Sequence, residues 1–513
     1  MASRLRFGVL AVALVTAALS ASCNLRRLER QLVSSRQLTT TDKESPYLKA
    51  HLKNGSVYVL SDWHADSSAA VIVGSGQLLD VNRTVVDSGR FRVPVDSVSL
   101  FETNVLHSSG ATTALTVMAG ITAGVAVVCL TNTKACFGSC PTFYADDELV
   151  AEGFSASIAP ALEATDLDML VRARPRGRDF TLRLTNEALE THVIRWADLI
   201  VAPRPSGGRV FVTPDGVFRN ATALAAPARC TTAEGDCLPA VMRLDGQERS
   251  STTDSTDLAT RETIELEFAP SDSGARGVGV VITARQSLLT TFLIYQSLAY
   301  MGHDAGRFLA ALSTMGANAR TQAGGLGRTL GRIDVLVPGD TGWIVTGSVG
   351  ETGPLAADTK VVPLPGTGAQ RVRLRMTKGL WRIDYVALAR LGGGDPVATE
   401  RLLPARVRRD GQDDPAALRA LRDSARVLTT LPGDKYELTY RLPPHPERYE
   451  LFLEARGYYL EWMRREWFAE QNSGLALGMF LDPAGALKRL APAYKKVEPD
   501  IERVFWNSRY AKP

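Results

Sequence analysis

The sequence predicts an α+β protein that is predominantly β and contains more than one β-rich domain. The main evidence is a series of short segments, between residues 47 and 455, in which apolar and polar residues alternate with a period of two and Gly residues mark the breaks. The second observation is size and composition. With 513 residues, of which 45% are hydrophobic and 22% charged, the chain is long enough for two to four hydrophobic cores, a rough count that follows from usual domain sizes.

The first residues predict export. Arg4 and Arg6 precede an apolar segment, residues 7–19, and small residues then lead to Cys23. This arrangement resembles a bacterial lipoprotein signal, in which cleavage leaves an acylated Cys, although Ser20 stands where that pattern has a Leu. We therefore expect residues 1–22 to be a signal peptide and Cys23 to be the lipid attachment site. The alternative is an ordinary cleavage site that has a Cys nearby.

Three segments follow before the larger domains. Residues 23–46 indicate a solvated tether, whose arginines could also touch anionic lipid headgroups. Residues 47–105 predict a small β-roll or SH3-like domain with Trp63 in its core. Residues 106–145 combine a CxxxC motif with an uncharged stretch, 111–130, which is either a buried or hairpin-inserted helix or a membrane span.

The remainder predicts two β-sandwich-like domains with helical additions. The first covers residues 146–315 and includes a buried apolar helix at 287–302, and the second covers residues 332–456. A Gly- and Ala-rich linker, 316–331, separates them, and residues 457–513 form a helical tail rich in aromatic residues. The clearest strands span residues 179–185, 192–203, 209–214, 262–268, 277–284, 332–337, 342–349, 371–376, 380–391, 436–442 and 449–455.

Six Cys residues in an exported chain favour disulfides. Cys230 and Cys237 enclose a short polar loop with a Gly, so we expect them to pair. Cys136 and Cys140 are closer together, and they form a structural disulfide, a redox-active pair or neither. The six His residues are scattered and no Cys or His spacing suits zinc, so we expect no metal and no cofactor.

Known catalytic motifs are missing from the sequence, and the charge argues against nucleic acid as a partner. The 59 basic and 55 acidic residues leave a net charge of only +4, without a basic stripe. The remaining site candidate is aromatic, at residues 457–468, where a helix would group Tyr458, Tyr459, Trp462 and Trp467. Such a group is either part of a core or a platform for sugar rings or a partner protein.

Two sets of segments resemble known families. KACFGSCPTFY (134–144) and AEGFSASIAPALEATD (151–166) resemble uncharacterised exported bacterial lipoproteins and a small domain of unknown function. Residues 185–203 and 432–462 resemble β-sandwich segments at the tails of secreted repeat proteins. These resemblances imply location and fold, and they assign no activity and no functional residues.

Taken together, these features lead us to expect a cell-envelope lipoprotein that faces the periplasm or the cell exterior. Its expected role is binding or scaffolding, with membrane lipid as a partner through the N-terminal anchor and an envelope protein or a glycan as a further partner. Two alternatives stay open. One is an enzyme, a hydrolase or a thiol-redox protein with a non-standard site, and the other is an accessory subunit of a membrane protein complex.

Overall fold

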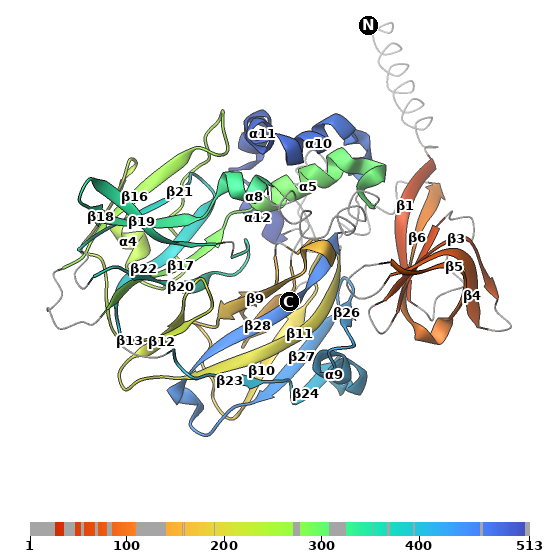
Figure 1. Cartoon of the computed structure of the whole chain (residues 1–513), viewed down its shortest axis with the longest axis horizontal. Coiled ribbons are helices and arrows are strands. Elements are labelled where there is room, and N and C mark those ends of the chain that lie inside the picture. The colour runs from red at the N-terminus through yellow and green to blue at the C-terminus, as the bar shows by residue number, and fades with distance from the viewer. Residues whose placement is uncertain are drawn as a thin grey trace, which may run out of the picture. The chain divides into compact units, whose positions relative to one another are not determined.

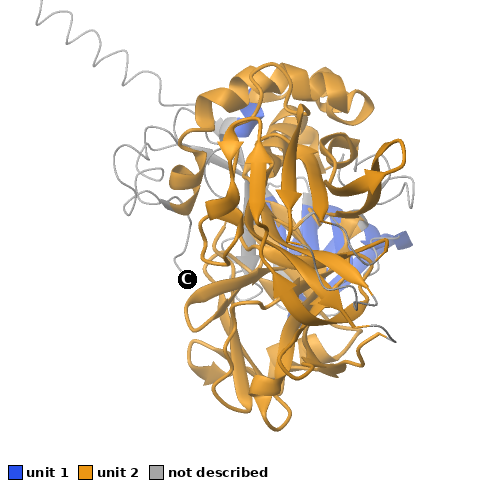
Figure 2. Ribbon diagram, turned by 90° about the vertical axis from the view of Figure 1, so that its left-hand side faces the viewer, with its two compact units in different colours: residues 1–130, 463–469 blue, residues 131–462, 470–513 orange. Residues whose placement is uncertain are grey.

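The computed structural model describes residues 26–34, 47–52, 56–66, 70–79, 85–108, 140–155, 157–158, 160–188, 190–269, 277–306, 325–350, 352–366, 370–392, 396–461 and 465–507. The chain divides into two compact units, which Figure 2 shows in different colours. Unit 1 comprises residues 1–130 and 463–469, and unit 2 comprises residues 131–462 and 470–513. The predicted fold class is confirmed, since the chain is predominantly β with additional helices.

Unit 1 contains one six-stranded sheet, sheet A, with the strand order β1-β6-β2-β3-β4-β5. Its strands are β1 (Arg26–Ser34), β2 (Tyr47–Leu52), β3 (Val57–Asp66), β4 (Val71–Leu79), β5 (Val85–Pro94) and β6 (Val98–Ser108). All neighbouring strands are antiparallel. Trp63 lies in the core, as predicted, with Leu60, Ile72, Val93 and Phe101.

Strand β1 differs from the predicted tether. It pairs with β6 residue by residue, from Arg26 opposite Ser108 to Ser34 opposite Leu100. The charged composition of this segment suggested a solvated linker. Sheet pairing, however, uses main-chain groups, so charged side chains do not prevent it.

Two sheets of unit 2 form a sandwich around one hydrophobic core. Sheet B has the order β25 (Gln412–Asp413), β24 (Arg406–Arg409), β27 (Lys435–Arg441), β10 (Asp179–Thr185), β7 (Thr142–Ala145) and β8 (Glu148–Glu152). Sheet C has the order β23 (Glu400–Leu402), β11 (Glu190–Pro203), β28 (Tyr449–Glu461) and β9 (Ala164–Met169), and β26 (Leu428–Thr430) also pairs with β11. The helix α9 (Pro415–Arg422) contributes Ala417 and Leu421 to the same core.

A closed barrel covers the opposite face of sheet C. Barrel D consists of β12 (Arg209–Val212), β13 (Phe218–Ala225), β22 (Trp381–Leu391), β17 (Val278–Gln286) and β20 (Asp358–Leu364). Ile200 of β11 and Phe452 of β28 pack with Phe211, Val281 and Val361 of the barrel. Both faces of sheet C are therefore buried, which explains why the predicted strand 192–203 is a nearly continuous apolar segment rather than an alternating one.

The last sheet of unit 2, sheet E, has six strands. Their order is β15 (Gly235–Asp236), β14 (Arg229–Thr232), β16 (Arg261–Glu267), β21 (Arg371–Thr377), β18 (Ile333–Gly339) and β19 (Gly342–Val349). Strand β19 contacts barrel D near Gly347, where an added Cβ would lie 2.6 Å from Cγ1 of Val362. In the described part of the chain, β15 and β19 are the two terminal strands of this sheet, and β19 also packs against β20 of barrel D.

Helices of unit 2 form a group that includes the predicted apolar helix, α5 (Leu289–Met301), whose side chains are largely buried. It contacts α10 (Ser473–Leu481), which also contacts α8 (Gly325–Leu330) and α11 (Pro483–Val497) (Figure 1). Two further α-helices in the described residues are α4 (Leu238–Val241) and α12 (Ile501–Asn507). Among the described helices none is long and apolar enough to cross a membrane, and residues 111–130 lie outside the described part.

The sheets cross the predicted domain boundaries. Sheet B combines β10 with β24 and β27, and barrel D combines β17 with β20 and β22, so the ranges 146–315 and 332–456 are interleaved rather than separate. The expected linker, 316–331, contains the helix α8. Local alternation predicts strands but carries no information about partners that lie more than a hundred residues apart.

Candidate functional site

The described cysteines divide into a disulfide and a buried residue. Cys230 and Cys237 form the predicted disulfide, with their Cα atoms 5.0 Å apart, and Cys237 N donates to Cys230 O at 3.0 Å. Both residues are buried at the β14–β15 hairpin, so the bond is structural. Cys140 is buried. Cys23 and Cys136 lie outside the described residues, and so the predicted alternatives for the Cys136–Cys140 pair stay open.

Cys140 lies beside a polar cluster at one end of the sandwich. The register of sheet C places Glu190 opposite Glu461 and His192 opposite Tyr459. A cavity of about 20 Å³ is lined by Cys140, Glu190, Tyr459 and Glu461 and by Tyr295 of α5. This volume holds about one water molecule, so the cavity has no space for an organic substrate.

Hydrogen bonds explain how these polar side chains are kept in the interior. The His192 and Glu190 side chains are 2.7 Å apart, Nε2 to Oε1, and both are buried. Tyr459 Oη donates to Ser155 O at 2.9 Å. Burial raises the pKa of Tyr459, and the neighbouring Cys140 and Glu190 raise it further, so its hydroxyl stays a neutral donor. These hydrogen bonds therefore stabilise the end of the sandwich where β11 begins and β28 ends.

The prediction that a helix at 457–468 groups these aromatic residues is wrong, because residues 457–461 belong to a strand. Strand β28 continues through Glu461, which places Tyr458 and Tyr459 on opposite faces of sheet C. Tyr458 packs with Val193 and Val427, Tyr459 belongs to the sandwich core, and Trp467 is also buried. Trp462 lies outside the described residues. Each of these three rings is buried, so they do not form an exposed platform for a sugar.

A second buried cluster joins three sheets of unit 2. Asp168 of β9 accepts from Glu152 N of β8 at 3.3 Å, and Asp358 of β20 accepts from Met169 N at 2.9 Å. Lys360 Nζ pairs with Asp358 and donates to Leu167 O at 2.6 Å. Burial raises the pKa of Asp168 well above 3.8, and the neighbouring Asp166 and Asp358 raise it further. The described residues contain no group of His, Cys, Asp or Glu that could hold a metal ion.

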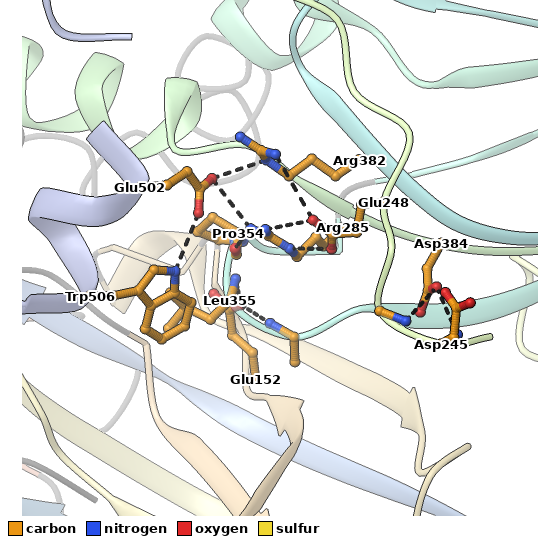
Figure 3. A network of polar contacts seen from close by, with 12 residues as sticks. Glu152, Asp245, Glu248, Arg285, Pro354, Leu355, Arg382, Asp384, Glu502 and Trp506 are labelled. Atoms are coloured by element: carbon orange, nitrogen blue, oxygen red, sulfur yellow. Dashed lines mark hydrogen bonds and ion pairs between the residues drawn. The ribbon is translucent and has the colours of Figure 1, made fainter. Parts of the chain in front are cut away.

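A third polar network connects α12 to barrel D (Figure 3). Arg285 donates to Glu248 at 2.6 Å and 2.7 Å and to Pro354 O at 2.7 Å, while Arg382 Nε lies 3.0 Å from Glu502 Oε1. Burial alone would lower the pKa of Arg285, but Glu502 and Glu248 outweigh it and the pKa is raised. Its charge is thus matched within the protein, as expected for a structural network.

The surface feature that stands apart is the edge strand β19. Exposed sheet edges offer unpaired main-chain groups to other chains, and proteins protect them with charged residues or by keeping the strand short. Within the described sheets the other edges follow this rule. Strands β15, β23 and β25 have two or three residues, and β1, β5, β8 and β9 carry Asp, Glu or Arg. Strand β19, GWIVTGSV, has eight residues and no charge.

Side chains around β19 combine apolar surface with arginine. Ile344 is 56% exposed and Val345 is 46% exposed. Arg373 lies over the Trp343 ring at 4.1 Å from its centroid, and Arg371 lies at 5.6 Å. These contacts place two guanidinium groups beside the indole ring. The edge can therefore offer main-chain hydrogen bonds, apolar contacts and positive charge at one place.

The sequence predicted β19 as a strand at 342–349 but not its position at an edge. Arg371 and Arg373 alternate with apolar residues in a predicted strand, which was the available signal that they share a face. Protein-family models and curated proteins were compared with the sequence, and neither comparison gives a match. The resemblances drawn from residues 134–166, 185–203 and 432–462 therefore stay predictions.

Proposed function

We propose that the protein is an exported binding module of the cell envelope, which docks an extended segment of a partner protein along β19. The observation that carries this proposal is the contrast between β19 and every other described edge, because only β19 is both long and uncharged. Strand addition to such an edge uses main-chain hydrogen bonds for affinity and side-chain contacts for specificity.

The chemistry of the edge indicates which segment it accepts. On the face beside Trp343, Arg371 and Arg373 pair with Glu265, and Arg375 pairs with Asp334. The Arg371 side chain is 52% exposed against 32% for Glu265, and Arg375 is 48% exposed against 27% for Asp334. Arg371 and Arg375 are thus more exposed than their acidic partners, whereas Arg373 is about as exposed as Glu265, at 35% against 32%. A strand with acidic side chains on this face and apolar ones near Ile344 and Val345 complements the edge.

Site-specific photo-crosslinking in cells of the native host tests this proposal. A benzophenone amino acid replaces Ile344 or Thr346 on β19, or Val86 on β5 as the control at a charged edge. A bound strand lies in fixed register with β19. Adducts from positions 344 and 346 must therefore fall two residues apart in one extended, acidic segment of the partner.

Each result of this experiment has a definite meaning. Adducts with the two-residue spacing support strand addition. Adducts that map to β19 of another copy would replace the partner with self-association, and adducts no stronger than those at Val86 would refute binding at β19.

Localisation is part of the same proposal and has its own test. We propose that Cys23 is acylated after export, which would hold the module at a membrane. Radiolabelled palmitate should enter the wild-type chain and not the Cys23→Ala variant. Equal labelling of the two would remove the lipid anchor but leave the role of β19 intact.

A further inference from the structure

The helix α10 presents an apolar ridge that no described side chain covers. Its sequence, SGLALGMFL, contains no charged residue. Ala476 and Met479 are buried towards the protein, whereas Leu477 is 51% exposed and Leu481 is 69% exposed. Residues four apart lie on one face of a helix, so these two leucines form a continuous ridge. They are the most exposed pair of leucines in the described part of the chain.

Local structure holds this ridge in place. The Asn472 side chain accepts from Leu475 N at 3.0 Å and caps the start of α10. At the other end, Asp482 N donates to Gly478 O at 2.9 Å, and the Asp482 side chain caps α11. Packing against α5, α8 and α11 supports the buried face. The helix is therefore anchored at both ends and along one side, and its exposed leucines do not depend on a flexible loop.

Basic residues lie on α8 and α11, two helices that contact α10. The helices α8, α10 and α11, which contact one another, contain five basic residues, Arg328, Lys488, Arg489, Lys495 and Lys496, and within their bounds no acidic residue. Three acids lie beside these basic residues, and one of them, Asp257, has its Oδ2 atom 4.0 Å from Lys488 Nζ. Asp482 pairs with Arg489 at 3.4 Å, and Glu498 pairs with Lys495 at 2.5 Å. An added Cβ on Gly478 would lie 3.0 Å from Nη2 of Arg489, which places a guanidinium group directly over α10.

We propose that the Leu477–Leu481 ridge inserts into an anionic lipid surface, with the basic side chains of α8 and α11 at the headgroups. Exposed leucines on α10 and Lys and Arg on the helices that contact it supply the two contributions to interfacial binding, burial of apolar area and attraction to anionic headgroups. Its buried apolar area is small, so this contact alone is weak. A weak contact becomes effective beside a second membrane attachment, because one acyl chain gives only marginal binding. The inference does not depend on strand addition at β19.

A fluorescent reporter placed in the ridge tests the insertion. An environment-sensitive fluorescent amino acid replaces Leu477 in the full chain, and Leu403, which is 42% exposed, provides the matched control. Vesicles contain equimolar phosphatidylglycerol and phosphatidylcholine with brominated acyl chains, which quench only fluorophores inside the bilayer. We expect quenching at position 477 and none at position 403. This readout is local, so other membrane attachments of the chain do not produce it.

Two variants separate the apolar and the charged contributions. Leu481→Glu should reduce quenching at position 477 roughly tenfold, because a carboxylate enters the ridge, and circular dichroism checks that the variant is folded. The double variant Arg328→Glu and Lys488→Glu should remove the preference for phosphatidylglycerol. An unquenched fluorophore at 477 in vesicle-bound protein would overturn the proposal. Equal quenching in pure phosphatidylcholine would overturn its assignment to anionic lipid.

Discussion

Strands β5 and β19 are both sheet edges, and they expose apolar side chains to a similar extent. Val86 on β5 is 57% exposed, and Ile344 on β19 is 56% exposed. The strands differ in everything else that matters at an edge. Strand β5 carries Asp87, Arg90 and Arg92 and ends at Pro94, and its pairing with β4 has an irregularity at Leu78/Leu79, whereas β19 has no charge and no Pro.

This difference separates an edge that is protected from an edge that is available. Charges and Pro on an edge strand disfavour pairing with another chain, because an added strand would bury the charge or miss a hydrogen bond. Exposed valine and isoleucine alone therefore do not mark a binding edge. What distinguishes β19 as a binding edge is the lack of charge along all eight of its residues. The following predictions test this comparison, from the largest expected effect to the smallest.

Introducing a charge on the available edge should have the largest effect. Val345→Lys places an ammonium group where a partner strand would pack, and we expect partner binding to weaken roughly a hundredfold, about 3 kcal/mol. Val345 is half exposed, so the free energy of unfolding should change by no more than about 0.5 kcal/mol. Titration of the cross-linked partner segment against purified protein measures the first quantity, and urea denaturation measures the second.

The matched control for this substitution is Val86→Lys on β5. That edge already carries charged residues, so a further charge should change neither binding nor solubility. If Val86→Lys weakens binding as much as Val345→Lys, the two edges are equivalent and the comparison fails.

The disulfide protects the opposite edge of sheet E. Strand β15 has two residues, and the Cys230–Cys237 bond closes its hairpin. Replacing both Cys by Ser should lower the free energy of unfolding by about 2 kcal/mol, from the loop entropy of an eight-residue ring. Denaturation with and without reductant measures this loss. The variant should become insensitive to reductant, and a loss of less than about 0.5 kcal/mol would mean that the loop is held by other contacts.

Much of the strand content follows from the sequence. The predicted strands at 179–185 and 342–349 coincide with β10 and β19, and the disulfide follows from the spacing of its cysteines. Alternating apolar residues and short polar loops are local signals, and these signals are sufficient to predict the two strands and the disulfide. The edge position of β19 is not local. It depends on the order of six strands that come from three separate parts of the chain.

The polar clusters show the same limit. His192 and Tyr459 are 267 positions apart in sequence and become neighbours only through the register of β11 and β28. The sequence pattern of residues 457–461 suits an amphipathic helix as well as a strand. Their pairing with β11 makes them part of a strand. Their aromatic content was the signal in favour of a strand, since Tyr and Trp are common in strands. The predicted tether at 23–46 and the predicted linker at 316–331 were wrong at 26–34 and 325–330 for a related reason. A polar composition does not prevent strand pairing, and a Gly- and Ala-rich one does not prevent a short helix.

Strand β9 shows a further way to protect an edge, a buried carboxyl group on Asp168, and this group predicts a pH dependence. The raised pKa of Asp168 means that the native state holds its proton more tightly than the unfolded chain does. As the pH rises above 3.8, the unfolded state releases this proton first, so native stability falls by up to about 1.4 kcal/mol per pH unit. In Asp168→Asn this dependence should disappear.

Urea denaturation of both proteins from pH 4.5 to pH 8 measures that difference. The stability of Asp168→Asn relative to wild type should increase steadily with pH until the native Asp168 is ionised. A constant difference across the range would show that the carboxyl group is already ionised in the native state. The control for loss of a carboxyl group as such is Asp62→Asn, at an exposed position of β3.

The smallest effect should come from the arginines beside β19. Arg373 lies 4.1 Å from the Trp343 centroid and Arg371 lies 5.6 Å away, and each also pairs with Glu265. Arg373→Ala should destabilise the fold by about 0.5 kcal/mol, since such contacts are weak at exposed sites, and Arg371→Ala by less. Both should weaken the binding of an acidic strand more than that of a neutral one. Equal losses for acidic and neutral peptides would mean that the arginines only orient Trp343, and the edge would then select its partner by shape rather than by charge.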